Sequence, residues 1–385
     1  MAINTRSPYY VSTSIANTHY SILEIYIWSG SKTGSVPITY SLKKYAQNGS
    51  IFVGYETSEL TRDYIDVTFE GDYDTPLIWQ KEVIKVYDVN NNLLQTIQYS
   101  TKSVFESYSY FEENSSFNIQ YKSLLMSNRE VFVLADNSFR IPIHTYTNPT
   151  VSFVKNGEVT SSQSFLSSTQ SSQQIEYVSS SGAGVDYDSF KSRVLIDSTS
   201  ASPSTFEDSK CLQDFFEEFE VGEVDTVLVS DTDGLQTIKI KTIEECKYEP
   251  KKVTFVNKFG VLQDMLFFKK SVQSMDVKKE SYKANTRNEL NQYSTSSHVN
   301  RDFNIIAKES ITLSSGYLSE EYNEVFKQLM LSEKVWVTNV TDTEVQILPI
   351  NVKTSDITYK TSVNNKLVEY TIDFDNSFDT INNIR

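Results

Sequence analysis

Short segments in which polar and apolar side chains alternate are the feature that most limits how this chain can fold. In Ser21–Trp28 the even-numbered positions fall on one face, and the apolar Leu23, Ile25 and Ile27 fall on the other. This period of two is typical of a half-buried strand. The chain also holds 24 Tyr and 22 Phe residues, which are side chains that strands favour. We therefore expect a mostly β, multi-domain fold of sandwich-like or barrel-like modules with a few short helices.

Turn residues between these segments predict where the chain reverses. Asn90–Asn92 and the pair Asn156 and Gly157 tolerate left-handed backbone angles, so each favours a hairpin. Asp231–Gly234 favours another hairpin, because the acidic residues that a calcium loop needs do not follow it. Residues 135–138 are also expected to join two strands as a hairpin. Strands are expected at 37–42, 51–55, 64–69, 83–89, 93–99, 130–134, 139–143, 151–154, 158–160, 226–230, 236–243, 253–257, 262–268, 303–313, 334–339, 343–349, 356–361 and 367–374.

Two segments instead have apolar residues spaced three and four apart, which predicts helices. One begins near Pro203, and the other spans Ser319–Leu331. Residues 161–184 are rich in Ser and Gln and have few apolar side chains, so we expect a flexible loop or an extended arm there. The apolar face of the first helix is expected to consist of Leu212, Phe215, Phe216 and Phe219.

The length of 385 residues fits two to four domains. We place an N-terminal β domain at residues 1–149. A middle β-rich domain at 150–250 contains the Ser/Gln-rich loop or arm and one helix. A C-terminal α+β domain occupies 251–385. The long polar stretch Lys269–Arg301 lies in this last domain and is a second candidate for an arm between subunits.

The formal net charge of −15 comes from 50 acidic and 35 basic residues. Affinity for nucleic acids comes largely from Lys and Arg, so this balance argues against sequence-specific binding of DNA or RNA. An acidic surface that lines a channel would instead repel passing DNA and keep it mobile. The simpler interpretation is that the charge keeps the protein soluble.

Neither a membrane span nor a secretion signal is expected. The longest apolar runs, at 131–135 and 265–268, are far shorter than the roughly 20 residues that cross a bilayer. Residues 1–20 are polar and lack the apolar core of a signal peptide.

No residue cluster indicates a catalytic, cofactor or metal site, and we expect none. His19, His144 and His298 lie in separate segments without metal-ligand spacing. Cys211 and Cys246 form neither a CxxC pair nor part of a zinc set. For these two residues, free thiols in a reducing cytoplasm and one disulfide bond are both open.

Carboxylate pairs and tryptophans are the remaining candidates. A glycosidase needs two carboxyl groups about 5 to 10 Å apart across a cleft, which a sequence does not reveal. Exposed Trp28, Trp79 or Trp336 would stack on sugar rings, although their places in or beside strands favour a core role. The carboxylate pairs are Asp72 and Asp74, Glu112 and Glu113, and Glu217 and Glu218.

Two segments carry a resemblance to a known class of proteins. They are Cys246–Lys270 (CKYEPKKVTFVNKFGVLQDMLFFKK) and Tyr317–Arg385, which runs from YLSEEYNEVFKQLMLSEKVWV to VEYTIDFDNSFDTINNIR. Both are similar to virion proteins of tailed bacteriophages, and most to tail-region proteins of phages that infect Bacteroidota, including the crAss-like group. The N-terminal part of the chain resembles these proteins more loosely.

The resemblance implies a non-enzymatic structural subunit of the virion tail that is assembled in the host cytoplasm. Such a ring, hub or baseplate subunit contacts copies of itself and other tail or portal-proximal proteins around the channel through which DNA leaves. No single residue is assigned a role by the resemblance. Two alternatives stay open, namely a tail spike or adhesin that binds host surface glycans and a glycan-degrading enzyme.

Overall fold

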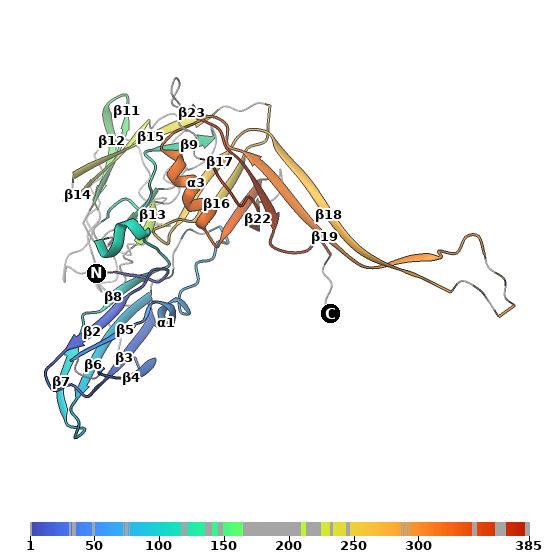
Figure 1. The fold of residues 1–385 in the computed structure, drawn as a ribbon. Coiled ribbons are helices and arrows are strands. Elements are labelled where there is room, and N and C mark those ends of the chain that lie inside the picture. Colours follow the sequence, from blue (N-terminus) through green and yellow to red (C-terminus); the bar gives the residue numbers. More distant parts are fainter. Residues whose placement is uncertain are drawn as a thin grey trace. The chain divides into compact units, whose positions relative to one another are not determined.

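The computed structural model confirms the mostly β fold and contains several separate sheets (Figure 1). It describes residues 2–30, 32, 36–47, 51–71, 73, 76, 78–116, 119, 122–134, 141–144, 149–164, 209–212, 225–231, 234–243, 247–285, 287, 289–290, 292, 294–340, 345–358 and 367–381. Among these residues, no helix is both long enough and apolar enough to cross a membrane.

The chain divides into two compact units, each assembled from separate stretches of sequence. Neither unit ends at 149/150 or 250/251, and the division into three domains stays a prediction. The first unit contains Met1–Glu244, Phe255–Met265 and Glu324–Ser332, and the second contains Glu245–Thr254, Leu266–Asn323 and Glu333–Arg385.

The N-terminal part of the first unit is a sandwich of two sheets. Its elements are β1 (Ile3–Asn4), β2 (Tyr10–Ser14), β3 (Tyr20–Ser29), β4 (Tyr40–Tyr45), β5 (Phe52–Glu56), α1 (Ser58–Arg62), β6 (Ile78–Tyr87), β7 (Leu93–Gln98) and β8 (Lys102–Phe105). The larger sheet has the order β1-β8-β6-β3-β4, with β7 also paired to β6, and the smaller sheet is β2-β5. Leu23 and Ile25 of β3 pack with Val53 and Tyr55 of β5 in the core between the sheets.

Most of the local predictions in this sandwich are confirmed. The strand expected at 21–28 is the centre of β3, and Asn91 closes the β6–β7 hairpin with a φ of 62°. The strand expected at 64–69 is wrong, because a turn and an irregular segment that follow α1 occupy this part of the chain. Val67 is fully buried there, and its backbone N donates to the Glu106 carboxylate at 3.4 Å instead of to a neighbouring strand.

A further sheet of the first unit has the strand order β12-β11-β14-β15-β9. The hairpins β11–β12 and β14–β15 are confirmed, with Asn156 and Gly157 at φ of 52° and 84° in the first of them. The 3₁₀ helix η1 (Phe111–Ser116) also belongs to this unit. The strands are β9 (Glu130–Leu134), β10 (Ile141–His144), β11 (Thr150–Lys155), β12 (Glu158–Ser164), β13 (Ser209–Leu212), β14 (Thr226–Asp231) and β15 (Gly234–Ile243).

The hairpin expected around residues 135–138 is wrong. Strand β9 pairs in parallel with β15, and β10 pairs with β13. The two strands therefore pair with strands that are distant in sequence and not with each other. The helix expected near Pro203 is wrong at Leu212, which lies in β13, while Phe215, Phe216 and Phe219 lie outside the described residues. The Ser/Gln-rich segment beyond Ser164 also lies outside them.

The main sheet of the second unit has the order β17-β16-β21-β22-β24-β19-β18, and the boundary between the units passes within β16 and β17. Helix α3 (Tyr322–Leu331), most of which belongs to the first unit, confirms the helix expected at Ser319–Leu331. Of the strand expected at 356–361, residues 356–358 are not a strand and the rest lie outside the described residues. The strands are β16 (Lys251–Val256), β17 (Leu262–Phe267), β18 (Ser271–Lys283), β19 (Asn300–Ser314), β20 (Leu318–Ser319), β21 (Val335–Val340), β22 (Val345–Val352), β23 (Leu367–Val368) and β24 (Thr371–Asn376).

Candidate functional site

The hairpin of β18 and β19 extends well past the strands beside it. The two strands pair from Ser271–Leu313 at one end to Lys283–Asn300 at the other. Strand β24 pairs with β19 only over Ser310–Ser314, and the last described backbone contact to β19 is Thr380 N donating to Ala307 O at 2.8 Å. Figure 1 shows both strands, in orange, running on beyond this point. We call residues 278–306 the arm.

Within the described part of the arm, side chains of its two strands contact each other. The Tyr282 and Phe303 rings meet edge to face with centroids 5.6 Å apart, and Lys279 Nζ contacts the Asp302 carboxylate at 2.8 Å. The hydrogen bond to Asp302 raises the pKa of Lys279 above its usual value. A bulge lies between Lys278 and Glu280, where Asn304 takes a φ of 51°.

The arm exposes several large apolar side chains although most of its residues are polar. Six large apolar side chains are between 36% and 76% exposed, namely Tyr282, Leu290, Val299, Phe303, Ile305 and Ile306. Strand β18 is also the last strand of its sheet, so its outer edge has no strand partner among the described residues. Open edges and exposed apolar side chains together mark surfaces that contact other chains.

The arm differs from the rest of the chain in the sign of its charge. Residues 278–306 contain five Lys and Arg and three Asp and Glu, a net charge of +2. Since the whole chain carries −15, the remaining residues carry −17. The arm is therefore a locally basic segment of an acidic protein.

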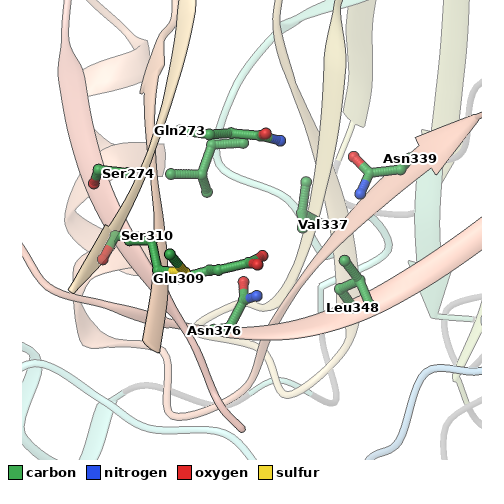
Figure 2. A pocket seen from close by; sticks show the side chains of 10 residues that line it. Gln273, Ser274, Glu309, Ser310, Val337, Asn339, Leu348 and Asn376 are labelled. Atoms are coloured by element: carbon green, nitrogen blue, oxygen red, sulfur yellow. The ribbon is translucent and has the colours of Figure 1, made fainter. Parts of the chain in front are cut away.

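A cavity of about 260 Å³ lies where the hairpin joins its sheet. Figure 2 shows the Gln273 and Glu309 side chains, from β18 and β19, pointing across the cavity toward Val337 of β21. Ile311 and Val337 are buried and form an apolar floor, while the amides of Asn339 and of Asn376 add polar groups. Such a mixture of polar and apolar lining suits a long side chain with a charged head.

The two carboxylates at the arm base have different surroundings. Glu309 has no ion-pair partner among the described residues and faces the cavity. Asp375 accepts a hydrogen bond from Ser310 Oγ at 2.8 Å and contacts Lys353 Nζ at 3.2 Å. Burial acts to raise the pKa of Asp375, but the Ser310 bond and the charges of Lys353 and Lys308 outweigh it and lower that pKa.

The histidines that the sequence offers lie in separate places. His144 is fully buried beside Phe105, the His19 ring contacts Tyr45 at 5.3 Å, and His298 lies in the loop at the tip of the hairpin. Among the residues that the structure describes, no three His, Cys, Asp or Glu side chains are grouped so as to hold a metal ion. The side chain of Cys211 and all of Cys246 lie outside the description, so their pairing stays open.

Of the carboxylate pairs, only Glu112 and Glu113 are described. Glu113 accepts hydrogen bonds from Lys258 Nζ and from the Tyr110 backbone N. These bonds give Glu113 a structural role. Asp72, Asp74, Glu217 and Glu218 lie outside the described residues.

The three tryptophans have different environments. Trp79 is only 1% exposed and donates its ring N–H to Gly30 O at 2.6 Å, so it has the core role that its strand position favoured. Trp336 is half-buried in β21. Trp28 is half-buried as well, but it lines a second cavity, on the outer face of the N-terminal sandwich.

The polar stretch Lys269–Arg301 covers most of the arm, and its length and polarity are the sequence signal for it. The cavity residues Gln273 and Glu309 had no comparable signal, because only the pairing of β18 with β19 brings them together. Comparisons of the chain with protein-family models, with curated proteins and with solved structures found no match.

Proposed function

We propose that this chain is a structural subunit of a bacteriophage tail and joins copies of itself through the arm, in a ring, hub or baseplate around the channel through which DNA leaves. The observation that supports this function is the arm, a long hairpin with open edges and six exposed apolar side chains. The resemblance of the final third of the chain to phage tail proteins supplies the setting.

An arm of this kind gains stability from a partner. A two-stranded ribbon alone in water is marginally stable, because it buries little apolar surface. A neighbouring chain provides that burial, either by packing on the exposed side chains or by adding a strand to the open edge of β18.

The charge of the chain favours a second copy as that neighbour. The basic arm of one copy is attracted to the acidic remainder of the next, and such head-to-tail contacts form a ring when their rotation closes. The cavity at the arm base is a fitting acceptor, since Glu309 suits a Lys or Arg head and the floor of Ile311 and Val337 suits its stem. The acidity of the remaining surface also suits a channel in which DNA slides.

Light scattering and negative-stain imaging of the purified chain test the assembly. We expect oligomers or rings for the natural sequence, and a monomer when residues 278–306 are replaced by Asn-Gly, a pair that closes a tight hairpin between Val277 and Ala307. An unchanged melting temperature shows that the shortened protein is folded. If both proteins have the same mass distribution, the arm does not join subunits.

Glu309→Gln tests the acceptor cavity without shortening the chain. Removing this charge is expected to weaken self-association by about threefold to tenfold, measured as the dilution midpoint in light scattering. Glu320→Gln, at an exposed position of the same unit, is the matched control and leaves the midpoint unchanged. Equal effects of the two changes would mean that the arm docks elsewhere.

A further inference from the structure

A second cavity, of about 410 Å³, lies on the outer face of the N-terminal sandwich. It is lined from neighbouring strands of one sheet, with Glu24, Tyr26 and Trp28 from β3, Lys81 and Lys85 from β6 and Gln98 from β7. Its volume falls in the range of about 300 to 1,000 Å³ that small-molecule sites occupy. The cavity is a feature of the first unit alone and shares no residue with the arm.

The alternation of β3 places these side chains together. Leu23, Ile25 and Ile27 point into the sandwich core, so the residues between them face outward. Where β3 pairs with β6, Tyr26 lies opposite Lys81. Where β7 pairs with β6, Gln98 lies opposite Val83, which is two residues after Lys81 on the same face of β6. Rigid strands therefore hold one aromatic, one charged and one amide group side by side.

The aromatic part of the lining offers flat apolar surface. Tyr26 and Trp28 are both half-buried, so part of each side chain is accessible at the cavity. The carbon–hydrogen face of a sugar ring is also flat and apolar, and it packs well on an aromatic ring. A row of two aromatic side chains along one strand matches two consecutive rings of a saccharide.

The charged groups of the lining differ in whether they have a partner within the described residues. Glu24 is only 8% exposed, contacts Lys85 Nζ at 2.6 Å and accepts a hydrogen bond from Tyr26 Oη at 3.2 Å. The bond to Glu24 raises the pKa of Lys85. Lys81 has no hydrogen-bond or ion-pair partner among the described residues. One carboxylate and two ammonium groups give the lining a net positive charge within an acidic protein.

We propose that this face binds an acidic saccharide, with its sugar rings on Tyr26 and Trp28 and a carboxylate of the sugar on Lys81. Gln98, which is exposed, is placed to exchange hydrogen bonds with the sugar hydroxyls. The binding function is independent of self-association through the arm, and it gives a tail protein a means of contact with charged surface glycans.

Isothermal titration of the full-length protein with oligogalacturonate, and with a neutral cello-oligosaccharide of equal length, tests the proposal. We expect binding of the acidic oligomer and at least about tenfold weaker binding of the neutral one. Tyr26→Ala and Lys81→Gln are each expected to lower the affinity for oligogalacturonate by about tenfold or more. The matched controls Tyr10→Ala and Lys239→Gln, at exposed positions on other strands, leave it unchanged.

The outcomes separate this inference from the proposed assembly. Absence of binding to oligogalacturonate by a well-folded protein overturns the saccharide site, whatever its oligomeric state. Equal affinity for the two oligomers, or an affinity that Lys81→Gln does not change, overturns the role of Lys81 and with it the preference for acidic sugars. Circular dichroism and melting curves of each variant confirm that it is folded.

Discussion

At the scale of single residues, a buried ion pair in the N-terminal sandwich depends most strongly on the presence of both its partners. Lys102 Nζ lies 2.9 Å from the Glu82 carboxylate, and the two side chains are 9% and 0% exposed. Gln80 and Tyr9 complete the set, since Gln80 Nε2 donates to Glu82 at 2.9 Å and Lys102 donates to Tyr9 Oη. Burial, followed by the nearby Glu82 charge, raises the pKa of Tyr9, so its hydroxyl stays protonated.

Replacing only one member of this ion pair is expected to lower the free energy of unfolding strongly. Lys102→Met leaves the Glu82 carboxylate buried without its counter-charge, so we expect the free energy of unfolding to fall by about 3 to 5 kcal/mol. Urea denaturation followed by circular dichroism measures this loss. The double variant Lys102→Met with Glu82→Gln is expected to recover part of it. A loss below about 1 kcal/mol for the single variant would show that water reaches Glu82.

At the scale of elements, the base of the arm is fastened by Asp375 of β24 to β19 through Ser310. The pKa of Asp375 is lowered in the folded state, so its contribution to stability is complete above its unfolded pKa. It is lost as the pH falls through the lowered folded value.

Asp375→Asn is therefore expected to be destabilising at neutral pH and to lose its effect in acid. The half-exposed lysines Lys308 and Lys353 are partly screened by solvent, so we expect a difference of about 1 kcal/mol or less at pH 7. Denaturation curves of both proteins from pH 7 to pH 2 measure this difference. A difference that grows as the pH falls would contradict the lowered pKa.

The strands and turns also show which features of the fold the local sequence predicts. Asn91 and Asn156 sit in left-handed turns, and both hairpins were predictable because the turn residue and its two strands are adjacent in sequence. The pairing of β9 with β15 was not predictable, since alternation identifies a strand but not its partner. Strand β18 was hidden for another reason. Nearly all of its residues are exposed on both faces, so no apolar face reveals its period of two.

At the scale of the whole molecule, opposite charges on the arm and on the remaining chain make the proposed assembly sensitive to salt. We expect self-association to weaken by about tenfold between 50 and 500 mM NaCl, because contacts between exposed charges are screened. Sedimentation of the natural sequence over this range measures the change, and the variant without residues 278–306 is expected to show little dependence. Association that strengthens with salt would instead indicate that the exposed apolar side chains of the arm dominate.

The parallel pairing of β9 with β15 also sets an order of events during synthesis. Val131 of β9 pairs with Ile240 of β15. About 110 residues separate these paired positions, and the ribosome adds about 5 to 20 residues per second. Strand β9 is therefore made on the order of 5 to 20 s before its partner strand. Chaperones and neighbouring nascent chains meet an unpaired strand during that interval, and slow translation of the residues between the two strands lengthens it.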